Sequence, residues 1–157
     1  MGMFGELLAQ PGVEEVVELR GTFGFMAFHG GSLEEMTDVV ARRAAEQSGA
    51  SYYGVHQPAD LQWHIPSSEI DPAVSPVLTS FLDHVDHVVT VHGYGRAGLW
   101  STLLLGGRNR ELADHVGEHL RRRLPVLLPS VWQEMRNNGG TSRACRRRVR
   151  RQFCKSR

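Results

Sequence analysis

The sequence predicts an α/β fold: a single domain with a mixed central sheet flanked by helices, followed by a divergent C-terminal tail. Apolar runs of strand type alternate with stretches in which apolar residues recur every three or four positions. Two of the runs end in His-Gly, at residues 29–30 and 92–93, and the pattern stops after Leu124. Strands that alternate with helices are typical of a sheet covered by helices, and 157 residues with 41% hydrophobic content suffice for one core.

Charge is distributed unevenly along the chain. Residues 1–124 contain nine Arg and sixteen acidic residues, a net charge of −7, whereas residues 125–157 contain nine Lys and Arg and one Glu, a net charge of +8. All eight histidines lie in the first part and both cysteines in the second. We therefore expect an acidic, histidine-rich α/β domain over 1–124 and an Arg-rich tail over 125–157, which is partly disordered because 136–157 has little to bury.

The first elements expected are two strands, over residues 13–19 and 24–28, joined as a hairpin by the short turn Arg20-Gly21-Thr22. This hairpin is the reason for predicting a mixed rather than a purely parallel sheet. A helix should follow from Leu33 to about Ser48-Gly49, with Ser32 as N-cap and Glu35 completing a capping box. Its apolar face comprises Leu33, Met36, Val40 and Ala44.

The next elements are predicted from β-prone runs and from cap residues. Strands are expected over residues 51–55 and 61–65. Asp71-Pro72 and Ser75-Pro76 each combine a cap residue with proline, and a helix of about ten residues should follow them. A buried strand over 86–91 then ends at His92, a further strand is expected over 98–105, and a last helix has the apolar face Leu112, Val116, Leu120 and Leu124.

Neither the N-terminus nor any apolar run indicates export or a membrane. Residues 1–8 lack a charged segment and a long apolar stretch, and no run approaches eighteen apolar residues. We therefore expect a cytoplasmic protein without a signal peptide or a membrane span. Cys145 and Cys154 could pair or bind metal, but two thiols with no partner histidine are a weak signal, and a structural or incidental role fits them better.

His29, Glu34 and His92 form the candidate site. Both histidines follow apolar strands, and the carboxyl ends of strands are where α/β proteins bind ligands. Two imidazoles and one carboxylate are the ligand set of hydrolytic zinc sites, which keep a position open for water. The alternative is that the histidines bond turn backbones and that Glu34 and Glu35 are solvated charges at a helix start. Spacing alone leaves both open, because the two strands must be neighbours for a shared metal.

Five blocks of sequence, in this order, resemble the zinc-dependent poly-γ-glutamate hydrolases of phage type. Together they span much of residues 13–124, and as a set they are far more specific than any one of them. The blocks are Ala-Phe-His-Gly-Gly-Ser-Leu-Glu-Glu-Met-Thr (27–37), Ser-Tyr-Tyr (51–53), Trp-His-Ile-Pro-Ser-Ser-Glu-Ile-Asp-Pro (63–72), Val-His-Gly-Tyr (91–94) and Leu-Gly-Gly-Arg-Asn (105–109).

The resemblance implies a compact α/β hydrolase related in architecture to carboxypeptidase A. It also implies that His29, Glu34 and His92 bind Zn²⁺, and that the substrate is an anionic γ-glutamyl polymer whose amide bonds are cleaved by zinc-activated water. Such a reaction needs a carboxylate as general base. In the family a Glu within a late Gly-Gly-x-Gln-Leu-Glu segment has this role, whereas here Gly139-Gly140 is followed by Thr-Ser-Arg-Ala-Cys. The chain is therefore expected to lack the family's base and to be impaired as a hydrolase.

Further residues are candidates for substrate contacts. His64 lies in a block shared with the family and would line the site, or else be a buried, hydrogen-bonded histidine. Arg96 and Arg108 follow predicted strand ends and would bind substrate carboxylates, or else be solvated loop charges. Tyr52, Tyr53 and Trp63 are expected in the core.

Two other functions remain open. One is a catalytically inactive binding protein for glutamyl polymers. The other is nucleic-acid binding through the arginines of the tail, which would weaken steeply with salt. Aromatic residues are scarce there, with only Phe153 near the arginines, so the sequence does not favour nucleic acid as a partner. The oligomeric state is left open by the sequence.

Overall fold

The computed structural model describes residues 2–94, 97 and 102–124. The described chain divides into two compact units, one of residues up to Gly93 and one from Tyr94 onward. The Arg-rich tail, Cys145 and Cys154, and most of the strand expected over 98–105 lie outside the described residues. Residues 102–105, which are described, do not form a strand.

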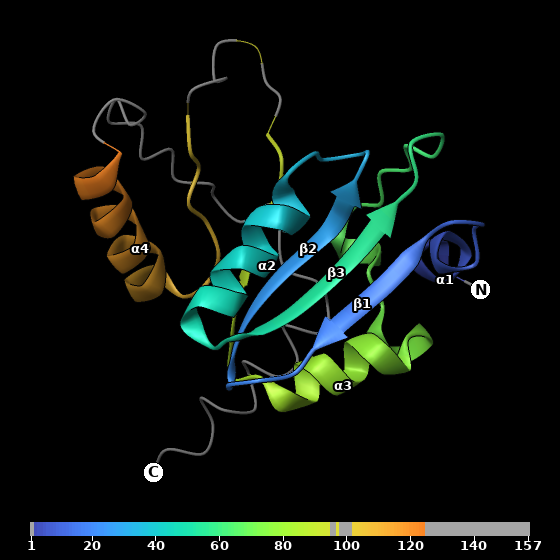
Figure 1. Cartoon of the computed structure of the whole chain (residues 1–157), viewed down its shortest axis with the longest axis horizontal. Helices are drawn as coiled ribbons and strands as arrows, with labels where there is room; N and C mark the ends of the chain where they lie inside the picture. The colour runs from blue at the N-terminus through green and yellow to red at the C-terminus, as the bar shows by residue number, and fades with distance from the viewer. Residues whose placement is uncertain (1, 95–96, 98–101, 125–157) are drawn as a thin grey trace. The chain divides into compact units, whose positions relative to one another are not determined.

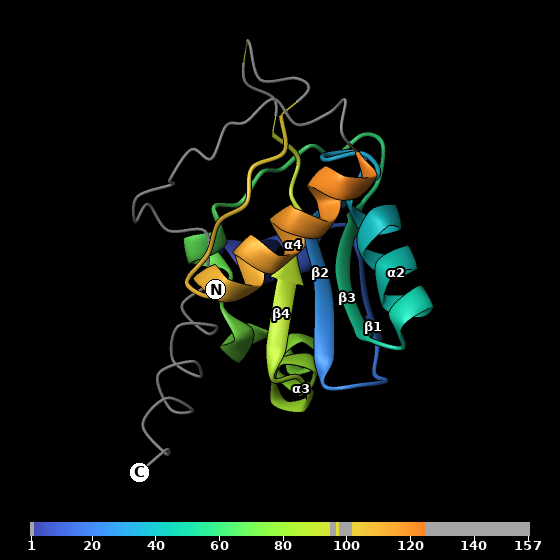
Figure 2. The same cartoon turned by 90° about the vertical axis from the view of Figure 1, so that its left-hand side faces the viewer.

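The first unit is built on a four-stranded sheet. Its strands are β1 (Glu14–Glu18), β2 (Phe23–Gly31), β3 (Ser51–Gln57) and β4 (His87–Thr90), arranged in the order β1-β3-β2-β4 (Figures 1 and 2). β2 is parallel to both β3 and β4, whereas β1 is antiparallel to β3. The predicted α/β class with a mixed central sheet is therefore confirmed.

The predicted hairpin of the first two strands is wrong, because β3 lies between β1 and β2. β1 pairs with β3 from Glu14↔His56 to Glu18↔Tyr52. The expected turn instead bonds the segment that leads into β3: the Gly21 N–H donates to the Gly49 carbonyl over 3.0 Å, and the Arg20 N–H donates to Ser51 Oγ over 2.8 Å. The sheet is mixed, as predicted, but for a different reason.

The first long helix, α2 (Thr37–Ser48), begins four residues later than predicted. The predicted capping box is absent, because the Ser32 hydroxyl donates to the carbonyl oxygens of Pro58 and Leu61 and Glu35 is exposed. Met36 precedes the helix with a φ of 71° and makes no side-chain cap. Residues 32–36 therefore form a loop, and this loop carries Glu34.

Helices cover both faces of the sheet (Figures 1 and 2). α2 packs on one face around Ala27, Ala41, Ala45 and Tyr52. α1 (Met3–Leu8) and α3 (Pro76–His84) contribute to the core on the other face, with Phe4, Leu7, Leu78 and Phe81 beside Tyr53 and Val55. α3 comes so close to β2 that a Cβ added at Gly24 would lie 2.6 Å from Phe81 Cζ. Tyr52 and Tyr53 are fully buried and Trp63 packs against the core, which confirms that interpretation.

The caps after β3 behave as predicted. Ser75 caps α3 by accepting from the Leu78 N–H, and Asp71 caps the short 3-10 turn Pro72–Val74, which follows a similar turn at Ser67–Glu69. In the second unit, α4 (Arg110–Arg123) forms as predicted, with Asn109 as its cap. No helix in the described part of the chain is long and apolar enough to cross a membrane.

Residues 61–65, predicted as a strand, run without sheet pairing. The buried side chain of Gln57 takes the place of a neighbouring strand: its amide donates to the Trp63 carbonyl over 2.9 Å and accepts from the Trp63 N–H over 2.8 Å. The apolar pattern that predicted a strand instead reflects Ile65, which is fully buried, and Leu61 and Trp63, which pack against the core. This segment passes beside the end of β2.

Candidate metal centre

The site lies where β2 and β4 end. These strands are parallel neighbours, paired from Phe23↔His87 to Met26↔Thr90, so their carboxyl ends meet at one edge of the sheet. β2 has an irregularity just before its end: Ala27 pairs with Gly54 and Gly30 with His56, so two residues of β2 face one of β3. Bulges of this kind redirect side chains and are common beside active sites. His29 lies in this bulge and is 2% exposed.

The backbone of Ile65 fixes the ring of His29. His29 Nε2 lies 2.9 Å from the Ile65 carbonyl oxygen. A carbonyl only accepts hydrogen bonds, so Nε2 carries the proton and the neutral ring has its lone pair on Nδ1. A metal-binding histidine typically makes this bond, donating from one nitrogen to a backbone carbonyl and binding the metal with the other.

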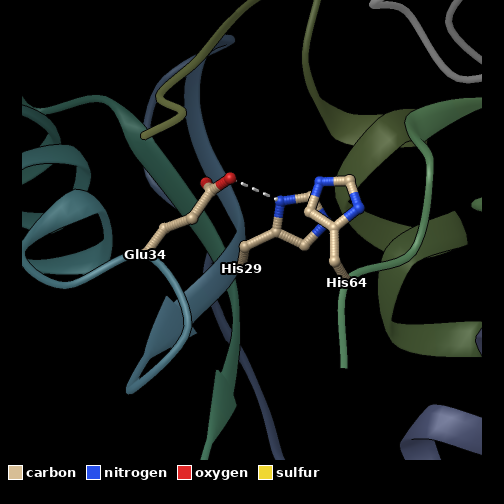
Figure 3. Close-up of side chains that lie close together, drawn as sticks. All are labelled: His29, Glu34 and His64. Atoms are coloured by element: carbon tan, nitrogen blue, oxygen red, sulfur yellow. Dashed lines mark ion pairs between the residues drawn. The ribbon is translucent and has the colours of Figure 1, made fainter. Parts of the chain in front are cut away.

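Glu34 comes from the loop between β2 and α2, and its two oxygens contact two different segments. Oε1 lies 3.2 Å from His29 Nδ1, as the dashed line in Figure 3 marks. Oε2 accepts a hydrogen bond from the Gly93 N–H over 3.0 Å and lies 3.6 Å from His92 Nδ1. The loop itself is closed by the Glu34 N–H, which donates to the His29 carbonyl over 2.9 Å. Glu34 therefore joins the end of β2 to the residues after β4.

Two more imidazoles adjoin His29. The ring of His64 has its centroid 4.5 Å from that of His29, and the two rings overlap in Figure 3. The His92 ring centroid is 5.5 Å from that of His29. One nitrogen or oxygen each from His29, Glu34 and His64 lies within 4.8 Å of the others, which makes these three a candidate metal-binding group. The structure thus brings His29, Glu34 and His92 close together, and His64, the expected site-lining residue, lies beside His29.

The donor pattern at His29 and Glu34 fits a cation. Nδ1 of His29 is buried and makes no hydrogen bond, although a carboxylate oxygen lies 3.2 Å away. With the ring proton on Nε2, the Nδ1 lone pair and the carboxylate would face each other in a buried place, which is unfavourable unless a positive charge lies between them, whether a proton held by both or a metal ion. Imidazole and carboxylate are ligands that zinc takes in proteins. The residues present therefore fit a bound metal ion.

The environment of Glu34 favours its charged form. Burial alone would raise the pKa of the carboxyl, but the neighbouring imidazoles of His29 and His92 and the Gly93 N–H outweigh burial and hold the pKa well below its usual range. Glu34 is thus a carboxylate at any physiological pH. A deprotonated carboxylate is what metal binding requires.

Glycines allow the close approaches around Glu34 and its loop. A Cβ added at Gly93 would lie 3.2 Å from Glu34 Cγ, and one at Gly30 would lie 2.6 Å from Asp38 Cβ. Gly31 has a φ of 75°, and its N–H donates to Asp38 Oδ2 over 3.3 Å. Asp38 on α2 therefore ties the helix to the turn between His29 and Glu34.

The remaining predicted residues are not part of this group. Arg96 lies outside the described residues, and Arg108 is an exposed residue of the second unit. Glu35, weighed as a solvated helix-start charge, is exposed. The backbone groups at the site, the Ile65 carbonyl and the Gly93 N–H, were not predicted, because nothing in a side-chain pattern reports which backbone atoms a folded chain presents.

The fold and the site together define an α/β protein with a histidine–carboxylate group, suited to a metal ion, at the carboxyl ends of parallel strands. A scan against family models matches the poly-gamma-glutamate hydrolase model over residues 6–128. This chain therefore belongs to the poly-gamma-glutamate hydrolase family, and the match indicates hydrolysis of poly-γ-glutamate. Searches among curated proteins and among solved structures found no match.

Proposed function

We propose that this protein is a zinc-dependent hydrolase of the γ-glutamyl amide bonds of poly-γ-glutamate. The observation that carries the proposal is the buried, unbonded Nδ1 of His29, which faces a Glu34 carboxylate kept in its charged form. The family match supplies the substrate class. A negatively charged polymer is also the substrate that the resemblance implies.

His29, Glu34 and His92 are the proposed zinc ligands. His29 would bind through Nδ1, because Nε2 is committed to the Ile65 carbonyl. Support for His92 comes from its position after β4, the parallel neighbour of β2, and from its Nδ1, which lies 3.6 Å from Glu34 Oε2. His64 is the competing third ligand, because it belongs to the most compact group of ligand atoms. Its exposure instead suits a role toward substrate.

When bound, zinc lowers the pKa of a coordinated water to about 7 and polarises an amide carbonyl. Hydrolysis joins the water oxygen to the amide carbon, breaks the carbon–nitrogen bond and delivers a proton from water to the leaving nitrogen. Glu34 contributes its negative charge and holds the segment after β4 through the Gly93 N–H. His64, an exposed imidazole beside His29, would accept a proton and pass it on in this proposal.

We further propose that the carboxylate base of the family is missing, so that turnover is slow. The printed sequence has no late Gly-Gly-x-Gln-Leu-Glu segment, and Glu35 is exposed. General acid–base catalysis contributes roughly 10²–10⁴-fold to rate. The cleavage rate should therefore be lower by about that factor than in a family member that has the base. Arg96 and Arg108 would bind substrate carboxylates only through local contacts. The domain as a whole is acidic, so it does not attract an anionic polymer over long range.

Zinc content and polymer cleavage, measured on one preparation, test this proposal. We expect about one tightly bound zinc per chain, lost in His29→Ala and in His92→Ala, and slow shortening of poly-γ-glutamate by the loaded protein. His87→Ala is the matched control, because His87 is an exposed histidine at the other end of β4. Full zinc content in both ligand variants would refute the site.

His64→Ala decides between the two ligand sets. If His92 is the third ligand, His64→Ala keeps its zinc and loses cleavage. If His64→Ala loses zinc while His92→Ala retains it, the assignment to His92 is wrong.

A binding protein for glutamyl polymers without catalysis is the second candidate function. It is favoured by the absence of the family's base segment from the printed sequence. Such a protein would bind poly-γ-glutamate when loaded with zinc and would not shorten it, even over long incubation.

A further inference from the structure

A second pair of histidines lies on α4, in the unit that does not contain the candidate metal centre. His115 and His119 are one helical turn apart, so they share a face of the helix. Their ring centroids are 4.3 Å apart, with 41° between the ring planes. Both side chains are exposed. Two imidazoles with this spacing on a helix are able to bind one metal ion together.

A local hydrogen bond sets the tautomer of His119. Its Nδ1 lies 2.9 Å from the His115 carbonyl oxygen, which only accepts, so Nδ1 carries the proton. The lone pair of the neutral ring is therefore on Nε2. As at His29, one ring nitrogen donates to a backbone carbonyl and the other is left as a ligand atom, which is the usual state of a metal-binding histidine.

The pair also fits the pattern His-x-x-Glu-His that one class of zinc peptidases uses. A catalytic site of that kind needs a third protein ligand and a free glutamate as base. Here Glu118 forms an ion pair with Arg122. Within the described residues, the three-ligand group found is that of His29, Glu34 and His64, and it does not include α4. The α4 pair therefore has the composition of a binding site and not of a second active site.

We propose that His115 and His119 bind a transition-metal ion on the surface of α4. The ion belongs to the class that prefers imidazole, namely Zn²⁺, Ni²⁺ or Cu²⁺, and water fills its other positions. Glu111, one turn before His115, adds an exposed negative charge that favours a dication. This site is independent of the function proposed for the first unit, because it shares no residue with the candidate metal centre.

Titration of the full chain with Cu²⁺ tests the proposal, since Cu²⁺ binds imidazole most strongly among these ions. The protein should carry Cys145→Ser and Cys154→Ser, because thiolates would compete for the ion. We expect a binding event that is lost in His115→Ala and in His119→Ala and kept in His87→Ala. The electron paramagnetic resonance spectrum of that event should show nitrogen ligands, and this contribution should be missing in both α4 variants, whereas the contribution of the candidate metal centre should stay.

The candidate metal centre binds the same amount of Cu²⁺ in all these variants, so a difference in Cu²⁺ binding between them comes from α4. Helix content from circular dichroism checks that both exposed substitutions leave the chain folded. Equal Cu²⁺ binding in His115→Ala, His119→Ala and His87→Ala would overturn the proposal. That result would leave the zinc centre untouched, since His29→Ala tests the centre separately.

Discussion

Single residues around the turn after β2 have large effects because the backbone there is crowded. His29, Gly31 and Glu34 lie within six residues and are fixed by the Ile65 carbonyl, the Asp38 carboxylate and the Gly93 N–H. Side-chain identity and backbone conformation thus depend on each other at this point. Substitutions that alter only the backbone should disturb metal binding as strongly as loss of a ligand.

Gly31→Ala should destabilise the protein and weaken metal binding. Gly31 has a φ of 75°, and an added Cβ would lie 2.2 Å from the Gln57 carbonyl oxygen. The left-handed conformation costs about 1–2 kcal/mol for alanine, and overpacking adds about 1–3 kcal/mol. Gly49→Ala is the matched control, because its φ is 69° and an added Cβ would meet nothing within 4 Å. Denaturant unfolding should show a loss of stability in both variants, larger in Gly31→Ala, and zinc titration should show weaker binding only in Gly31→Ala. Equal stability and equal zinc affinity of the two variants would contradict this account.

Tyr53 should make the protein sensitive to alkaline pH. Burial, and then the nearby Glu15 carboxylate, raise the pKa of this phenol well above its ordinary value of 10.0. Below pH 10 the phenol is protonated in the folded and unfolded states alike, so its stabilising effect is complete. Above pH 10 the unfolded chain loses the proton first, so stability falls as pH rises. Tyr53→Phe should lower stability at neutral pH by about 1 kcal/mol and reduce the slope above pH 10; an unchanged slope would show that Tyr53 does not titrate in this way.

At the scale of elements, the cap residue of α3 also connects the helix to the sheet. Ser75 begins α3 by accepting from the Leu78 N–H over 2.9 Å, and its hydroxyl donates to Glu15 on β1. Glu15 also accepts from the Tyr53 hydroxyl over 2.5 Å. One buried serine therefore connects the start of a helix, an edge strand and the neighbouring strand.

Ser75→Ala should cost clearly more than an ordinary cap. Loss of a cap costs about 0.5–2 kcal/mol, and removing a buried hydrogen-bond partner from a carboxylate adds about 1–3 kcal/mol. Asp71→Ala is the control, because Asp71 caps only a short exposed turn through the Ala73 N–H. Urea unfolding of both variants measures the difference. Equal losses would mean that the link to Glu15 contributes nothing.

The sequence predicted elements well where their signals are local. The cap and proline at Ser75-Pro76 placed α3, and an apolar stripe placed α4. It failed where an element depends on distant partners. β1 pairs with β3, which lies more than thirty residues further along the chain, and not with β2. The segment 61–65 is held by the Gln57 amide and not by a neighbouring strand. The start of α2 was misplaced because Ser32 bonds residues near 60 instead of capping the helix.

The site was predictable in part for the same reason. His29 and His92 follow apolar strands, and this local signal located each of them at the end of a strand. Whether their strands were neighbours was not readable, since strand order is a property of the whole sheet. The approach of His64 to His29 rests on side-chain bonds from Gln57 and Ser32 to residues 61–65, and no spacing in the sequence encodes them.

At the scale of the whole molecule, charge and chemistry are separated along the chain. The proposed ligands and His64 lie within residues 29–92, whereas the positive charge is concentrated after residue 128. The family match also ends at residue 128. Removal of residues 129–157 changes the net charge from +1 to −7, because the removed segment carries nine Lys and Arg and one Glu.

We expect a chain ending at residue 128 to keep its zinc. Its isoelectric point should become acidic, and any binding to DNA should disappear, since phosphate contacts depend on Lys and Arg. Zinc content, isoelectric focusing and DNA binding at two salt concentrations check the three expectations. Loss of zinc on truncation would show that residues after 128 are needed for zinc binding, which His29, Glu34 and His92 as the ligands do not predict.

The insertion of β3 between β1 and β2 has a consequence for folding kinetics. The first two strands are joined by only four residues and would meet early as a non-native hairpin, since short loops close fastest. That pairing must open before residues 51–57 can enter between them. Refolding from urea should therefore slow at low denaturant, where the misfolded hairpin is most stable, and proline in place of Thr22 should relieve this by disfavouring the premature turn.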